Sequence, residues 1–148
     1  MKSKLVKLLI GTMSIFLGGM IYVLFRKDSL LMFHWFDFIG CLQIIEHLRA
    51  HSVYLIKLLP SWVIYSLPTG LWLFGGILLF SSIWGKIVYV KIIWITLFAL
   101  VAIGSELGQY FGLVRGTYDL MDLIVMVISI ATAVFIDYIF FNREHYEK

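Results

Sequence analysis

Four long apolar segments dominate the sequence, at about residues 5–25, 67–84, 92–111 and 120–141. A helix needs roughly 20 mostly apolar residues, rising about 1.5 Å each, to cross the hydrocarbon core of a bilayer. Hydrophobic residues make up 61% of the chain and charged residues 14%, and 148 residues are too few to bury so much apolar surface in a water-facing core. We therefore predict an all-α integral membrane bundle of about four transmembrane helices, forming one domain over residues 1–148.

The distribution of basic residues predicts the orientation, because Lys and Arg are enriched in cytoplasmic loops. The first segment has the basic start of a signal peptide, but its apolar run is too long, so we expect a retained helix. With the N-terminus inside, the cytoplasmic basic residues are Lys2, Lys4, Lys7, Lys86, Lys91, Arg143 and Lys148. The remaining basic residues, Arg26, Lys27, Arg49, Lys57 and Arg115, fall outside. We expect a multi-pass membrane protein with both termini in the cytoplasm, and we expect Asp137 to reach toward the cytoplasmic headgroups.

The connection over residues 26–66 is too apolar for a plain loop, yet it carries several charged residues and histidines. A helix lying in the membrane interface fits this composition. A shallow or re-entrant segment is the alternative. Membrane lipids are the expected partners of the chain in either case.

Small residues recur at a spacing of four on the third segment, at Gly104, Gly108 and Gly112. Such a stripe lets helix backbones approach closely. We predict helix packing within the bundle, with a dimerisation face as the alternative. Similar pairs occur at Ser14 and Gly18 and at Ser129 and Ala133.

One polar stretch interrupts the apolar pattern around the third and fourth segments. Glu106 and Gln109 are three residues apart and so share one helix face. A carboxylate inside a membrane helix is costly and normally faces the bundle interior with a partner. Arg115 could supply that partner, and Asp119 and Asp122 are placed to cap the fourth helix. These residues predict either a structural cluster or a polar ligand site opening to the extracytoplasmic headgroups.

The same stretch resembles the VanZ-like family of small bacterial membrane proteins, whose founding member is a teicoplanin-resistance protein. The resemblance covers about 20 residues: Glu-Leu-Gly-Gln at 106–109, then Gly-Thr-Tyr-Asp-Leu-Met-Asp-Leu at 116–123. Asp122 would match the Asp that opens the last helix of the family. Met126 and Ser129 stand where members often carry Asn and Gly, so the chain resembles a divergent member. The resemblance implies a location in the bacterial inner (cytoplasmic) membrane and a role in the cell envelope that affects sensitivity to a glycopeptide antibiotic.

A second constellation is the pair His47 and His51, four residues apart on an expected helix. Such a pair could share a zinc ion, with His34 or Asp37 completing the site. Histidines at a wet interface are the commoner explanation, so we expect no metal here.

From these features we expect a protein that binds or shields an extracytoplasmic headgroup, such as a lipid-linked envelope precursor. The ligand site would comprise Glu106, Gln109, Arg115, Asp119 and Asp122. The alternatives are a non-catalytic membrane subunit, held to a protein partner or a second copy, and an intramembrane enzyme acting on lipid-linked substrates. No catalytic motif or phosphate-binding loop is evident, and we expect no catalytic residue, cofactor or nucleic-acid partner.

Overall fold

The computed structural model describes residues 2–27 and 30–146 and is helical throughout, with no strand in these ranges. Its helices are α1 (Lys2–Phe25), α2 (Leu31–Phe38), α3 (Leu42–Ile56), α4 (Ser61–Tyr65), α5 (Leu67–Ile83), α6 (Val88–Tyr110) and α7 (Leu120–Tyr146). The predicted all-α bundle is thus confirmed. Lys148, which counted toward the predicted orientation, lies outside the described residues.

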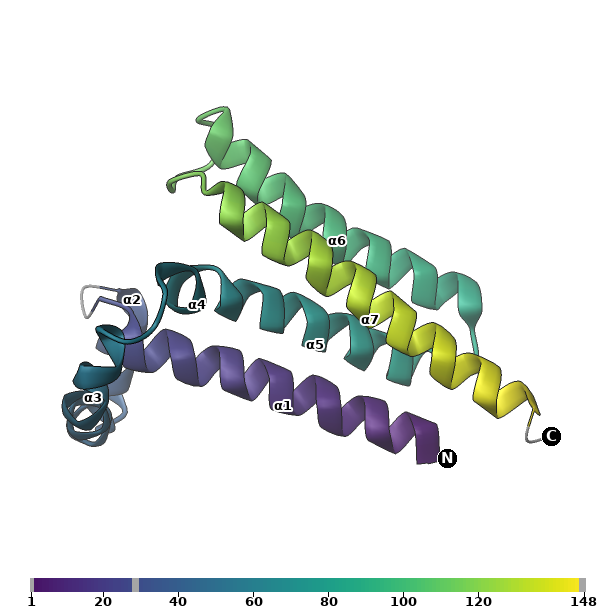
Figure 1. Cartoon of the computed structure of the whole chain (residues 1–148), viewed down its shortest axis with the longest axis horizontal. Coiled ribbons are helices and arrows are strands. Elements are labelled where there is room, and N and C mark those ends of the chain that lie inside the picture. The colour runs from purple at the N-terminus through teal and green to yellow at the C-terminus, as the bar shows by residue number, and fades with distance from the viewer. Residues whose placement is uncertain (1, 28–29, 147–148) are drawn as a thin grey trace.

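Four of these helices, α1, α5, α6 and α7, lie side by side, and each runs opposite to the one before it along the chain (Figure 1). Three of them, α1, α6 and α7, are long and apolar enough to cross a membrane. The fourth, α5, has 17 residues, or about 26 Å, slightly less than a hydrocarbon core of about 30 Å. The N- and C-terminal ends of the chain lie at the same end of the bundle.

The outer surface of the bundle is apolar. Phe16 of α1, Val101 of α6 and Phe135 of α7 are 59%, 70% and 63% exposed. Apolar side chains in this number need a surrounding other than water. The three long apolar helices and this surface indicate a membrane protein.

The core of the bundle is centred on α5, which contacts α1, α6 and α7. Leu73, Ile77 and Leu78 of α5 are buried together with Met126 and Ala133 of α7. Phe80 of α5 stacks on an aromatic ring of α6, with a centroid distance of 5.7 Å. The shortest of the four helices is therefore the one that the other three pack around.

Close helix contacts are made by the glycines of α5. A Cβ atom added at Gly75 would lie 2.5 Å from the backbone oxygen of Gly11 in α1, so these two backbones touch. Gly70 packs against Ser129 of α7, and Gly76 packs against a phenylalanine of α6. Gly18 of α1 contacts the indole of Trp72. Small residues thus mediate helix packing, as is common in membrane bundles.

The predicted packing role of Gly104, Gly108 and Gly112 is wrong within this chain. A Cβ atom at Gly104 would meet nothing within 4 Å, and Gly108 packs against Val114 of the following turn rather than against another helix. Gly112 lies beyond the end of α6 with a φ of 70°. The N–H groups of Gly112 and Leu113 donate to the carbonyls of Gln109 and Gly108, which is the Schellman motif that ends helices at a glycine.

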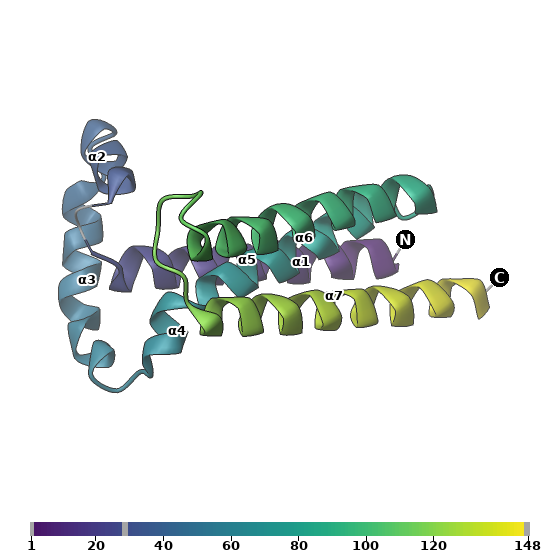
Figure 2. The same ribbon diagram turned by 90° about the horizontal axis from the view of Figure 1, so that it is seen from above.

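The segment over residues 26–66 folds across one end of the bundle. Figure 2 shows α3 running roughly at right angles to the long helices, not between them. Arg49 of α3 holds it there: its Nη1 and Nη2 donate to the carbonyls of Val23 and Arg26, at 2.6 and 2.8 Å. These are carbonyls at the C-terminal end of α1, where a cation is favoured. The α6–α7 turn lies at the same end of the bundle as this segment.

Candidate functional site

Glu106 lies near the C-terminal end of α6 and is buried, with 3% of its surface exposed. Its Oε1 accepts a hydrogen bond of 2.7 Å from the backbone N–H of Asp119. The buried carboxylate of α6 therefore holds the residue that immediately precedes α7. The inward orientation predicted for this acid is confirmed.

Asp119 is the N-cap of α7, as one of the sequence interpretations predicted. Its Oδ1 accepts a hydrogen bond of 2.9 Å from the backbone N–H of Met121. This is the usual arrangement at a helix N-terminus, where an Asp side chain satisfies an otherwise free N–H. Glu106 and Asp119 together fasten the start of α7 to the end of α6.

Asp122 occupies the third position of α7, one turn after the cap. In a capping box the acid at this position would accept the N–H of the N-cap residue. Glu106 takes that N–H instead. The Oδ1 atom of Asp122 is left buried without a hydrogen-bond partner among the residues that the structure describes. A buried carboxylate oxygen without a donor is unfavourable, so this atom needs an explanation.

The turn between the two helices folds over Gln109. Gly116 has a φ of 148°, and a Cβ atom there would lie 2.5 Å from Oε1 of Gln109. A side chain at position 116 would therefore collide with Gln109. The turn brings Gln109 beneath Gly116 while Glu106, Asp119 and Asp122 gather at the start of α7.

Arg115 does not neutralise Glu106. It is exposed on the turn, and the ion pairs found in the described residues do not include one between these two side chains. The guanidinium was expected to reach back to the carboxylate, but the backbone N–H of Asp119 occupies that place. The site thus holds acidic groups without a basic partner in the described part of the chain.

A second polar cluster, which the sequence reading missed, lies at the opposite end of the bundle. Asp137 of α7 is 7% exposed. Its Oδ1 accepts from the Nζ of Lys7 at 2.9 Å and its Oδ2 from the Nζ of Lys91 at 2.7 Å. Ser81 of α5 also donates to Asp137 and accepts from Lys7. One residue from each of the four long helices meets here.

This cluster corrects the prediction for Asp137, which does not reach toward the headgroups but is buried against its partners. Lys7 and Lys91, which counted toward the predicted orientation, are also buried. Because α6 begins at Val88, a turn earlier than predicted, Lys91 lies inside the helix. The sequence did carry a signal for this cluster. In an antiparallel bundle, the N-terminal parts of α1 and α6 lie beside the C-terminal parts of α5 and α7, so polar residues in these parts can meet.

The two histidines of α3 lie together on its exposed surface. The rings of His47 and His51 have centroids 4.5 Å apart, and Nδ1 of His51 is 2.8 Å from the carbonyl oxygen of His47. No group of three or more His, Cys, Asp or Glu side chains placed to hold a metal ion occurs among the described residues.

Comparison with known proteins assigns no role to either polar cluster. No protein-family model, curated protein or solved structure matches this chain.

Proposed function

We propose that the chain is a VanZ-like protein of the bacterial cytoplasmic membrane that holds an extracytoplasmic headgroup at its acidic α6–α7 site. The ligand would be the polar or cationic head of a lipid-linked envelope precursor. Through that contact the protein would alter sensitivity to a glycopeptide antibiotic, as the resemblance over residues 106–123 implies.

The proposed topology has four crossings, with both termini in the cytoplasm. An even number of crossings is supported by the position of both chain ends at one end of the bundle. The shorter α5 would cross with its neighbours because it lies at their centre. The α2–α3 segment and the α6–α7 turn would then share the outer headgroup layer.

The observation that carries the proposal is a buried carboxylate, Glu106, together with a buried oxygen of Asp122, neither of which has a cationic partner in the described residues. Glu106 is 3% exposed, and Oδ1 of Asp122 has no donor among the described side chains and backbone groups. An ammonium or hydroxyl of a bound headgroup would supply the missing donor and offset the cost of burying charge. Arg115, exposed at the rim, would contact the phosphate of such a ligand.

A purely structural role accounts for part of the site only. The hydrogen bonds of Glu106 and Asp119 are explained by fastening and capping α7. They leave Oδ1 of Asp122 unexplained, and a neutral amide at position 106 would still accept the N–H of Asp119. Charge is therefore the property that separates the two roles.

Glu106→Gln tests this directly, because glutamine keeps an acceptor oxygen for the N–H of Asp119 while losing the negative charge. We expect expression of the parent chain to raise the teicoplanin concentration that bacteria tolerate. Glu106→Gln should abolish this increase while the protein accumulates normally in the membrane. Its unfolding free energy should not fall by more than about 1 kcal/mol, because the acceptor oxygen is kept and the cost of burying a charge is removed.

In this proposal Asp119 caps α7 and does not contact the ligand. Asp119→Asn is therefore the matched control, since asparagine is an equally good N-cap and Asp119 is exposed. It should retain most of the increase. The proposal is wrong if Glu106→Gln protects as well as the parent chain while Glu106→Ala does not, because only the acceptor oxygen would then matter.

A further inference from the structure

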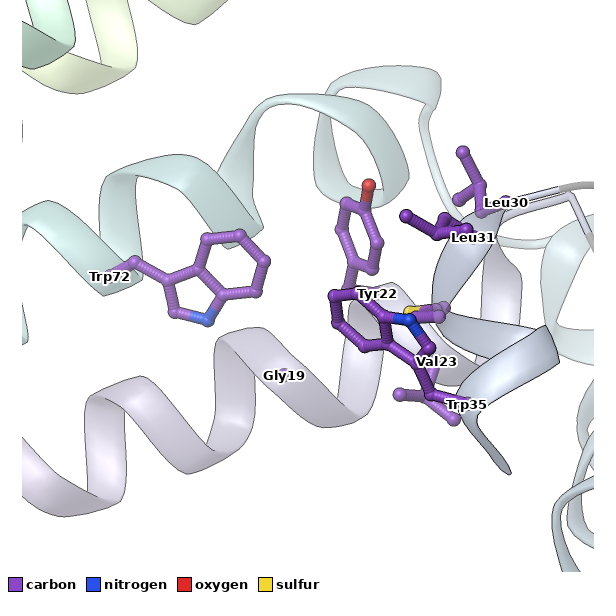
Figure 3. A pocket seen from close by; sticks show the side chains of 8 residues that line it. Gly19, Tyr22, Val23, Leu30, Leu31, Trp35 and Trp72 are labelled. Carbon is purple, nitrogen blue, oxygen red and sulfur yellow. The ribbon is translucent and has the colours of Figure 1, made fainter. Parts of the chain in front are cut away.

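An apolar cavity of about 420 Å³ lies beside the C-terminal half of α1, at the end of the bundle where α2 and α3 fold across (Figure 3). Its size is within the range of small-molecule sites. Its walls are mostly hydrocarbon and aromatic rings, among them Tyr22 and Val23 of α1, Leu31 and Trp35 of α2, and Trp72 of α5. It is separate from both polar clusters.

Gly19 forms the floor of this cavity. A Cβ atom at Gly19 would meet nothing within 4 Å, whereas one at Gly18 would lie 2.8 Å from the indole of Trp72. Neighbouring glycines of α1 therefore differ: Gly18 is packed against α5, and Gly19 opens onto empty space. The side chain missing at position 19 leaves room for a ligand.

Arg26 lies next to Tyr22, which lines the cavity, and its guanidinium is held in place. The guanidinium carbon is 5.1 Å from the ring centroid of Tyr22 and 5.0 Å from that of Tyr65. Nη2 donates to the carbonyl of Tyr65 at 3.1 Å, while Nε is buried without a partner in the described residues. A guanidinium has five N–H donors; with one given to Tyr65 and the one on Nε buried, about three remain for a ligand.

Tyr22 connects the two features. Its ring lines the cavity, lies 5.2 Å from that of Trp72 and also carries the guanidinium of Arg26. Arg49 nearby is already committed to the carbonyls of α1. Arg26 makes no ion pair with a carboxylate of the described chain. The ring of Tyr22 thus contacts the apolar cavity and also the guanidinium of Arg26, which is held in place.

We propose that this cavity binds one hydrocarbon chain of an anionic phospholipid whose phosphate is held by Arg26. A hydrocarbon chain matches the apolar walls, and a phosphate matches a guanidinium in charge and in geometry. The exposed Lys27 next to Arg26 adds to the attraction for an anionic headgroup. This site is independent of the α6–α7 site and of the function proposed for it.

Native mass spectrometry of the full chain in detergent tests the proposal, with phosphatidylglycerol and phosphatidylcholine of identical acyl chains as probes. We expect phosphatidylglycerol to bind about tenfold more tightly, because its headgroup keeps a net negative charge whereas choline offsets the phosphate of phosphatidylcholine. Gly19→Leu fills the cavity and should weaken binding of both lipids at least tenfold. Arg26→Gln should weaken phosphatidylglycerol binding more than phosphatidylcholine binding and so reduce the preference for the anionic lipid.

Matched controls are available for both variants. Gly104→Leu makes the same substitution at a glycine that also faces open space, and Lys57→Gln removes an exposed cation immediately after α3; both should bind like the parent. Glu106→Gln should also bind normally, which separates this site from the α6–α7 site. Equal binding by Gly19→Leu and Gly104→Leu would overturn the proposal, even if Arg26→Gln failed to fold. So would an undiminished preference for phosphatidylglycerol in Arg26→Gln.

Discussion

Asp137 is the residue on which the packing of the four long helices depends most. It accepts hydrogen bonds from side chains of the other three, including two buried ammonium groups. Charges in a membrane interior are tolerated when they pair with one another. Such a cluster also sets register, because sliding one helix by a residue would separate the partners. We therefore interpret it as a device that fixes how the helices align.

Asp137→Asn tests this interpretation. Asparagine keeps the shape but leaves Lys7 and Lys91 without their shared carboxylate, so the free energy of unfolding should fall by about 3–5 kcal/mol. Denaturant titration of the purified protein in detergent measures the change. Replacing the whole cluster by apolar residues (Lys7→Met, Lys91→Met and Asp137→Leu) should recover most of the loss, because no uncompensated charge remains. An unchanged free energy of unfolding in Asp137→Asn would show that the cluster does not stabilise the packing of the helices.

Glu106 and Asp137 differ in how far the sequence could predict their surroundings. Glu106 is joined to Asp119, 13 residues away, and this local pairing could be anticipated from a helix, a turn and a cap. Asp137 is joined to Lys7 across 130 residues. Its position near a helix end gave a plausible local explanation, which was wrong because the pairing depends on how all four helices align. The residues of the acidic α6–α7 site could be predicted from the sequence. The absence of an ion pair between Arg115 and Glu106 could not.

At the scale of the element, the central place of α5 could not be read from its sequence. It is the shortest of the four long helices and is apolar all round, so it has no face that indicates its neighbours. The glycine stripe of α6 was the more regular pattern, yet the close backbone contacts are made by α5. Spacing alone does not distinguish a glycine that packs from one that ends a helix, as Gly112 does.

Gly75→Ala and Gly104→Ala separate these two kinds of glycine. At Gly75 the new methyl group would press on the backbone of Gly11, and we expect a loss of about 1–3 kcal/mol in stability, typical of overpacking. At Gly104 the methyl group meets open space, and the higher helix propensity of alanine should stabilise the chain by up to about 1 kcal/mol. Thermal unfolding in one detergent compares them. Changes of equal size and sign would contradict the packing described for α5.

At the scale of the whole molecule, the number and class of the long helices could be predicted, because long apolar segments can do little else. For residues 26–66 the sequence could not decide between an interfacial helix and a re-entrant segment, because polar and apolar residues are mixed along it. The structure places α3 across the end of the bundle, tied there by Arg49. This arrangement puts the α2–α3 segment and the acidic site at one end and the Asp137 cluster at the other.

The proposed function requires that the α6–α7 turn faces outward from the cell. Thr117 is exposed in that turn and Lys86 is exposed in the turn between α5 and α6, at the opposite end. In a Cys41→Ser chain, which has no other cysteine, each position can carry a single thiol. We predict that a membrane-impermeant maleimide labels Thr117→Cys on intact cells and labels Lys86→Cys only after the membrane is permeabilised. The reverse pattern, or equal labelling of both on intact cells, would contradict an outward-facing site.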